Sequence, residues 1–168
     1  VVIEPQVGFP QSGDQLLPFT PASLAGTWQA LEKAVDVGLC HHIGVSNFSL
    51  KKLEMLLSMA RIRPAVNQVE LHPYLQQSEL LTFAKSQNIL LTGYSPLGSG
   101  DRSAAFQTEA EPKLLADPVI SEIATEQGCS AAQVLLAWAI QRGTLTIPKS
   151  VNPERLQQNF RAADITLT

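Results

Sequence analysis

A cluster of cationic and hydroxyl side chains lies near the end of the chain, where an apolar run gives way to the start of a helix. The segment, residues 146–160, reads TIPKSVNPERLQQNF and contains Lys149, Ser150 and Arg155. A helix start offers N–H groups and a positive dipole end, which suit an anion, whereas an Arg in the first turn is unfavourable unless an anion compensates. We expect Asn152 to cap this helix and still leave N–H groups free. The pattern favours a phosphate site over a solvated loop before a capped helix.

Amide side chains end two other apolar segments. Asn47 follows the run at residues 42–46, and Gln68 lies in the run at residues 65–70. A primary amide both donates and accepts hydrogen bonds, so a carboxamide is its natural partner. Ser46 adds a hydroxyl group beside Asn47. The alternative interpretation, in which these groups satisfy loop backbone, stays open.

An aromatic residue ends a third apolar run. Tyr94 lies between Gly93 and Ser95. An aromatic side chain there can plug a core or stack on a planar ring, and periodicity alone favours the plug. Gly93 would let another group approach the backbone closely. Taken together, an amide pair, an aromatic ring and a phosphate clamp match the parts of a nicotinamide dinucleotide that carries an extra phosphate.

Short apolar runs and helix-forming segments alternate along the chain. The patterns predict buried strands at residues 42–46, 65–70, 89–94 and 144–148. Helix starts are indicated at Ser23, Ser49, Ser78, Asp117, Ser130 and Asn152. In the last of these helices, Leu156 and Phe160 are expected to face inward.

This alternation predicts an α/β fold with a parallel sheet covered by helices. The Gly-x-Gly-x-x-Gly fingerprint of an open dinucleotide-binding sheet is absent, and polar groups end each strand, as in a TIM (β/α)8 barrel. Only Glu70 places a carboxylate at a strand end, which disfavours a glycosidase with paired carboxylates. Because a barrel typically needs about 250 residues, we expect residues 1–168 to form a single incomplete domain, a partial TIM barrel of four C-terminal strand–helix units.

Composition narrows the classes of function. The 168 residues are 45% hydrophobic and carry a net charge of −3, which argues against nucleic-acid binding. No run of apolar residues is long enough to span a membrane. The two cysteines, Cys40 and Cys129, have neither a disulfide framework nor metal-ligand spacing. We therefore expect no metal site and a reducing, cytoplasmic location.

Four motifs, in matching order and spacing, closely resemble the aldo-keto reductase family. They are IGVSNF at residues 43–48, VNQVELHPY at 66–74, GYSPLGS at 93–99 and IPKS at 147–150. The resemblance covers essentially the whole chain. It implies a TIM barrel that uses NADP(H) to reduce aldehydes or ketones to alcohols. It also implies a small-molecule carbonyl substrate and an intact protein that is a monomer.

The resemblance also assigns cofactor contacts. Those expected around the nicotinamide are Ser46, Asn47, Gln68 and the stacking Tyr94. Those expected along the pyrophosphate are Ser95, Leu97, Ser99 and Asp101. Those expected around the 2′-phosphate and adenine are Lys149, Ser150, Val151, Asn152, Arg155, Gln158 and Asn159. Asn152 departs from the family pattern, because a hydroxyl residue is commoner at its position.

The catalytic residues of the family have no counterpart in these 168 residues. The resemblance places its Asp, Tyr, Lys and His upstream of Val1, so we name no catalytic residue and expect this chain alone to be inactive. Ile3 and Phe9 are candidates for the wall of the substrate pocket. Two alternatives remain: a non-catalytic, NADP-binding or regulatory truncated barrel, and a phosphosugar enzyme that uses Lys149 and Ser150 for its substrate.

Overall fold

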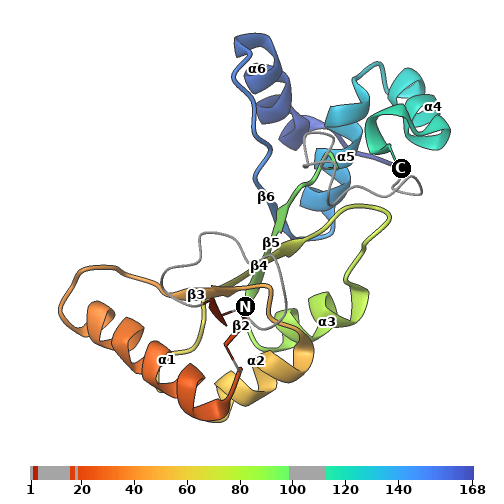
Figure 1. Cartoon of the computed structure of the whole chain (residues 1–168). Coiled ribbons are helices and arrows are strands. Elements are labelled where there is room, and N and C mark those ends of the chain that lie inside the picture. The colour runs from red at the N-terminus through yellow and green to blue at the C-terminus, as the bar shows by residue number, and fades with distance from the viewer. Residues whose placement is uncertain (1, 4–15, 18, 99–112) are drawn as a thin grey trace. The chain divides into compact units, whose positions relative to one another are not determined.

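The computed structural model describes residues 2–3, 16–17, 19–98 and 113–168. The chain divides into two compact units, Val1–Asn67 and Gln68–Thr168, and each is described by itself. Figure 1 labels their helices and strands.

Four strands form one sheet, in the order β3-β4-β5-β6. Their bounds are Gly44–Ser46, Val66–Glu70, Leu90–Tyr94 and Leu145–Thr146. Strands β5 and β6 pair in parallel, with Thr92 opposite Leu145 and Gly93 opposite Thr146. Helices separate consecutive strands along the chain, as Figure 1 shows. The predicted α/β fold is therefore confirmed, and the parallel sheet with its helices fits four units of a partial TIM barrel.

The first unit contains a short strand pair and two helices. Strands β1 (Val2–Ile3) and β2 (Leu16–Leu17) pair antiparallel, and neither is among the strands that the sequence pattern predicted. Helix α1 spans Pro21–Asp36, and helix α2 spans Leu50–Leu57. The prediction that Ser23 caps α1 is wrong. Thr20 is the cap, and Ser23 is the third helical residue, whose hydroxyl completes a reciprocal capping box.

Helix α1 packs its apolar stripe into the core of the first unit. Trp28 is 2% exposed and shares a buried cluster with Leu24, Ile43 and Leu56. The stripe follows the helical period. Strand β3 comes very close to β4 at Gly44, where a Cβ atom would lie 2.7 Å from Cγ2 of Val66. Glycine at this position therefore allows the two strands to pair.

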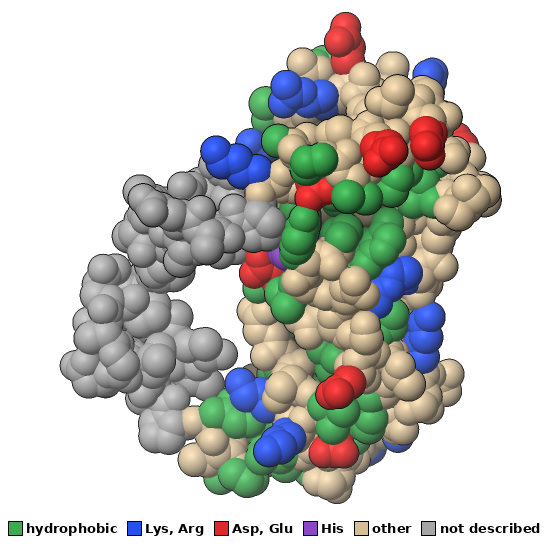
Figure 2. Space-filling view, turned by 90° about the vertical axis from the view of Figure 1, so that its right-hand side faces the viewer, with side chains coloured by type: hydrophobic (Ala, Val, Ile, Leu, Met, Phe, Trp, Pro, Cys, Tyr) green, Lys and Arg blue, Asp and Glu red, His purple; other side chains and the backbone are tan. Residues whose placement is uncertain are grey.

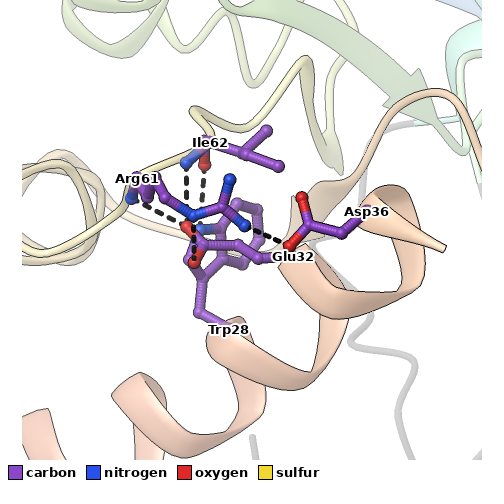
Figure 3. Close-up of polar contacts among 5 residues, drawn as sticks. All are labelled: Trp28, Glu32, Asp36, Arg61 and Ile62. Carbon is purple, nitrogen blue, oxygen red and sulfur yellow. Dashed lines mark hydrogen bonds and ion pairs between the residues drawn. The ribbon is translucent and has the colours of Figure 1, made fainter.

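Side chains of α1 hold the loop that leads into β4 (Figure 3). The buried Glu32 accepts hydrogen bonds from the backbone N–H groups of Arg61 and Ile62, at 2.7 and 2.8 Å. The indole N–H of Trp28 donates to the carbonyl of Ile62 at 2.9 Å. The Arg61 guanidinium pairs with Asp36 at 2.6 Å. Side chains of one helix thereby satisfy partly buried backbone groups of this loop.

The second unit contains four α-helices among its described residues. They are α3 (Ser78–Ser86), α4 (Pro118–Glu126), α5 (Ala131–Gln141) and α6 (Pro153–Arg161). Two short 3-10 helices, η3 (Leu114–Ala116) and η4 (Ala162–Asp164), complete them. The predicted caps of α4, α5 and α6 are confirmed, since Asp117, Ser130 and Asn152 each accept a hydrogen bond from the first turn. Helix α3 differs, because its cap is Gln77 in a left-handed conformation.

Helix α6 contradicts one expectation. Leu156 and Phe160 were expected to face inward, yet they are 49% and 86% exposed. The helical period placed both residues correctly on one face, but no element among the described residues covers that face. Periodicity identifies an apolar face without showing what packs against it.

Candidate functional site

The exit of β3 carries the first predicted site residues. Ser46 ends the strand and is exposed, and Asn47 follows in a left-handed conformation, with φ of 58°. The fully buried Asn67 holds the next residue: its amide accepts from Phe48 N–H at 3.3 Å and donates to Phe48 C=O at 2.8 Å. Asn67 therefore fixes the backbone beside Asn47. No role was predicted for Asn67, although an Asn within an apolar strand is a usable signal of a buried hydrogen bond.

The end of β4 carries three polar residues at alternate positions. Gln68, Glu70 and His72 are all half-buried. His72 Nε2 lies 3.5 Å from a carboxylate oxygen of Glu70, while its Nδ1 is buried and has no hydrogen-bond partner among the described residues. Because residues two apart on a strand share a face, Gln68 and Glu70 lie on the same side of the sheet.

The exit of β5 places Tyr94 and Ser95 at a sharp turn. Tyr94 is half-buried, and Ser95 has a positive φ of 49°, a conformation that costs roughly 1–2 kcal/mol for most residues. The carbonyl of Ser95 accepts from the N–H of Gly98 at 3.0 Å, which closes the turn. The space left by Gly93 is taken by Leu71 of the same unit, whose Cβ lies 3.2 Å from a built Cβ. The close approach expected at Gly93 is therefore made by Leu71, in the segment that follows β4.

The structure brings the ends of β4 and β5 together. Leu71 N–H donates to the carbonyl of Tyr94 at 3.3 Å. Gln68 and Tyr94, which the sequence analysis assigned to one planar ligand, therefore lie on adjacent strands of the second unit. Pairing of parallel strands explains this arrangement, since their carboxyl ends meet at one edge of the sheet.

The predicted phosphate cluster lies at the start of α6. Lys149 and Arg155 are exposed, and Ser150 is half-buried. The oxygen of the Asn152 side chain accepts from the N–H groups of Glu154 and Arg155, at 2.9 and 3.1 Å. Ser150 Oγ accepts from Asn152 N–H at 3.2 Å.

These bonds correct the expectation that Asn152 would leave N–H groups of the first turn free. Pro153 has no N–H group. The N–H groups of Glu154 and Arg155 donate to the side-chain oxygen of Asn152, and that of Leu156 donates to its carbonyl. An anion at this helix start must therefore be held mainly by side chains, with the helix dipole adding a smaller contribution.

Only some of the remaining predicted cofactor and substrate residues lie in the described part of the chain. Leu97 is half-buried at the turn after β5, Val151 and Gln158 are exposed, and Asn159 is half-buried. Ser99, Asp101 and Phe9 lie outside the described residues. Ile3 lies in β1, of whose side chains nothing is described.

One further polar contact was not predicted. The hydroxyl of Tyr74 donates to the carboxylate of Asp117, although the two residues are 43 positions apart. This bond raises the pKa of Tyr74 above its ordinary value. The same bond, with help from the N–H of Ile120, lowers the pKa of Asp117. No periodic pattern could have indicated a contact over this separation.

Charges on the described surface are mixed. Figure 2 shows Lys and Arg side chains at several separate places on the face in view, with Asp and Glu side chains among them. Within the parts of the chain that are described, no group of three or more His, Cys, Asp or Glu side chains could hold a metal ion. The described helices are also too short or too polar to cross a membrane.

Comparison of the sequence with known proteins finds one family. The model of the aldo/keto reductase family matches residues 14–168. A relative in Synechocystis sp., aldo/keto reductase slr0942, is 88% identical over all 168 residues, which make up 51% of that protein. Aldo-keto reductase family 1 member A1 is 44% identical in Xenopus tropicalis and 42% in Homo sapiens, each over 160 residues. Those 160 residues are 95% of this chain and 48% and 49% of the two proteins.

The fold and the strand exits define an α/β chain of the TIM-barrel type with its polar groups at the carboxyl ends of parallel strands. The chain belongs to the aldo/keto reductase family. It spans about half the length of the curated relatives that it matches.

Proposed function

We propose that this chain supplies the NADP(H)-binding part of an oxidoreductase that reduces aldehydes or ketones to alcohols. The proposal rests on the side chains that gather at the start of α6 in this member of the family. Two exposed cations, Lys149 and Arg155, flank a hydroxyl, Ser150, on a backbone that Asn152 has already capped. Two cations and a hydroxyl suit the charge and the oxygen acceptors of a 2′-phosphate.

The nicotinamide end would use the exits of β4 and β5. The amide of Gln68 can both donate to and accept from the carboxamide, and Tyr94 offers a ring that can stack on the nicotinamide. The cofactor, when bound, supplies the hydride for the carbonyl carbon. The residues of this chain hold and orient it, whereas the general acid that protonates the carbonyl oxygen would lie outside these 168 residues.

The test compares two forms of the protein. The first is the 168-residue chain, and the second, here named the completed chain, joins it to the part of the Synechocystis relative that it does not match. The completed chain should oxidise NADPH in the presence of a simple aldehyde, as followed by absorbance of the reduced nicotinamide. The 168-residue chain should show no turnover, because no residue in it is assigned as the general acid.

Tyr94→Phe is the sharpest control. In the completed chain this variant keeps the ring and should retain most of the turnover. Turnover by the 168-residue chain that Tyr94→Phe abolishes would contradict the proposal, because Tyr94 would then be the acid. Failure of the completed chain to use NADPH would leave a non-catalytic binder, which a fluorescence titration with NADPH detects directly.

A further inference from the structure

The segment Leu114–Asp117 contacts the exits of both strands that carry the proposed nicotinamide contacts. It forms η3 and the cap of α4, and it lies within the second unit. It is not adjacent in sequence to either strand exit that it contacts. We call these four residues the brace.

The brace contacts the β5 exit through an apolar residue. Leu114 is 1% exposed and packs in a cluster that includes Leu97. It also lies against Gly98, where a built Cβ would be 3.4 Å from Cδ1 of Leu114. Gly98 has a φ of 80°, so the turn after Tyr94 passes over Leu114 in a conformation that suits glycine.

The brace contacts the β4 exit through a polar residue. The chain after β4 forms a tight turn in which His72 and Leu75 exchange backbone hydrogen bonds. Tyr74 projects from this turn and donates its hydroxyl hydrogen to Asp117. On the other side of the turn, Gln77 donates to the carbonyl of Glu70 at 3.1 Å. The turn is thus held from two directions.

Asp117 suits this position because its carboxylate has two oxygen atoms. Oδ1 accepts from the N–H of Ile120 at 3.0 Å and caps α4, while Oδ2 accepts from Tyr74. A serine could cap the helix equally well but is too short to serve both partners. The cap and the contact to Tyr74 can therefore be separated by substitution.

We propose that the brace is a positioning element that sets Gln68 on β4 and Tyr94 on β5 at the spacing that a nicotinamide ring needs. This inference rests on the proposed function. Since Leu71 N–H already bonds to the carbonyl of Tyr94, a shift of either exit would change the distance between the amide and the ring. No described contact links the brace to Lys149 or Arg155, so the phosphate end should not depend on it.

The first test is independent of any ligand. Hydrogen exchange is measured in the 168-residue chain at the amide of Leu71, with Tyr74→Phe, Asp117→Ser and the double variant. Each variant should raise the exchange rate about threefold or more, and the double variant should match the single variants because both remove one contact. Thr82→Ala, which also removes one exposed hydroxyl bond, from Thr82 to Ser78 C=O in α3, serves as the control. If Tyr74→Phe raises the exchange rate of the Leu71 amide no more than Thr82→Ala does, the proposed role of the brace is refuted.

The second test uses the completed chain and two ligands. Tyr74→Phe should weaken binding of NADPH about threefold. It should leave binding of adenosine 2′,5′-bisphosphate, which lacks the nicotinamide, unchanged. Equal weakening of both ligands, or of neither, would overturn the positioning role. If the unsubstituted completed chain binds neither ligand, the proposed function fails, and hydrogen exchange still decides whether the brace joins the two exits.

Discussion

Single residues in this chain hold backbone segments that secondary structure leaves without partners. Glu32 is the clearest example, because one carboxylate oxygen accepts from two consecutive N–H groups of the loop before β4. Asn67 does the same for both backbone groups of Phe48. Such buried side chains contribute mainly by preventing unsatisfied polar groups, and their removal costs more than the bonds themselves stabilise.

Replacing Glu32 by alanine should therefore destabilise the chain strongly. The variant leaves the partly buried N–H groups of Arg61 and Ile62 without their side-chain acceptor, and we expect the free energy of unfolding to fall by about 1–3 kcal/mol. Urea denaturation followed by circular dichroism measures this. Glu32→Gln keeps a carbonyl acceptor, so its free energy of unfolding should fall by less than half as much. Equal losses in the two variants would show that the charge, not the acceptor, matters.

The contact between Tyr74 and Asp117 should respond to pH at both ends of the range. The pKa of Asp117 is lowered from 3.8, so its contribution to stability is present above that value and is lost as pH falls through the folded pKa. The pKa of Tyr74 is raised from 10.0, so its contribution is complete below that value and is lost as pH rises through the folded pKa. The difference in Tm between the chain and Tyr74→Phe should be largest between about pH 5 and pH 9. A difference that stays constant from pH 2 to pH 11 would contradict the contact.

At the scale of elements, two glycines of the first unit should respond oppositely to the same substitution. Gly44→Ala places a methyl group against Val66 and should force β3 and β4 apart, at a cost of about 1–3 kcal/mol. Gly26→Ala meets nothing within 4 Å and should stabilise α1 by about 0.5–1 kcal/mol. Thermal unfolding of both variants checks the signs. A stabilising Gly44→Ala would mean that the two strands are not closely paired.

Much of the architecture follows from local signals. The four strands of the sheet were predicted within three residues of their ends because short apolar runs and flanking turns are local properties. Asp117, Ser130 and Asn152 were identified as caps because their side chains act within one turn. Ser23 was misassigned because Thr20 offers the same chemistry three residues earlier. Gln77 escaped prediction because glutamine rarely adopts a left-handed conformation.

The candidate site was predictable where the motif itself carries the chemistry. Lys149, Ser150 and Arg155 are close together in sequence, so their charges and hydroxyl could be recognised without a structure. The same pattern predicted free N–H groups at the helix start, but two of them donate to Asn152. Sequence spacing does not show which N–H groups a capping side chain binds. Asn67 and Tyr74 act on partners 19 and 43 positions away, and such contacts follow from topology alone.

At the scale of the whole molecule, the chain comprises two compact units and corresponds to about half of its relatives. The exposed apolar face of α6, with Leu156 and Phe160, shows that the second unit has surface which the described residues do not cover. We propose that the start of α6 selects NADPH over NADH.

Calorimetric titration of the completed chain with NADPH and with NADH tests that claim most directly. NADPH should bind at least about tenfold more tightly, because only NADPH carries a 2′-phosphate, which the two cations can bind. Lys149→Ala and Arg155→Ala should each remove most of this preference and leave NADH binding nearly unchanged. Lys33→Ala, which removes an exposed cation from α1, should change neither affinity. Equal affinities for the two cofactors in the unsubstituted protein, or a preference that survives both substitutions, would contradict the account.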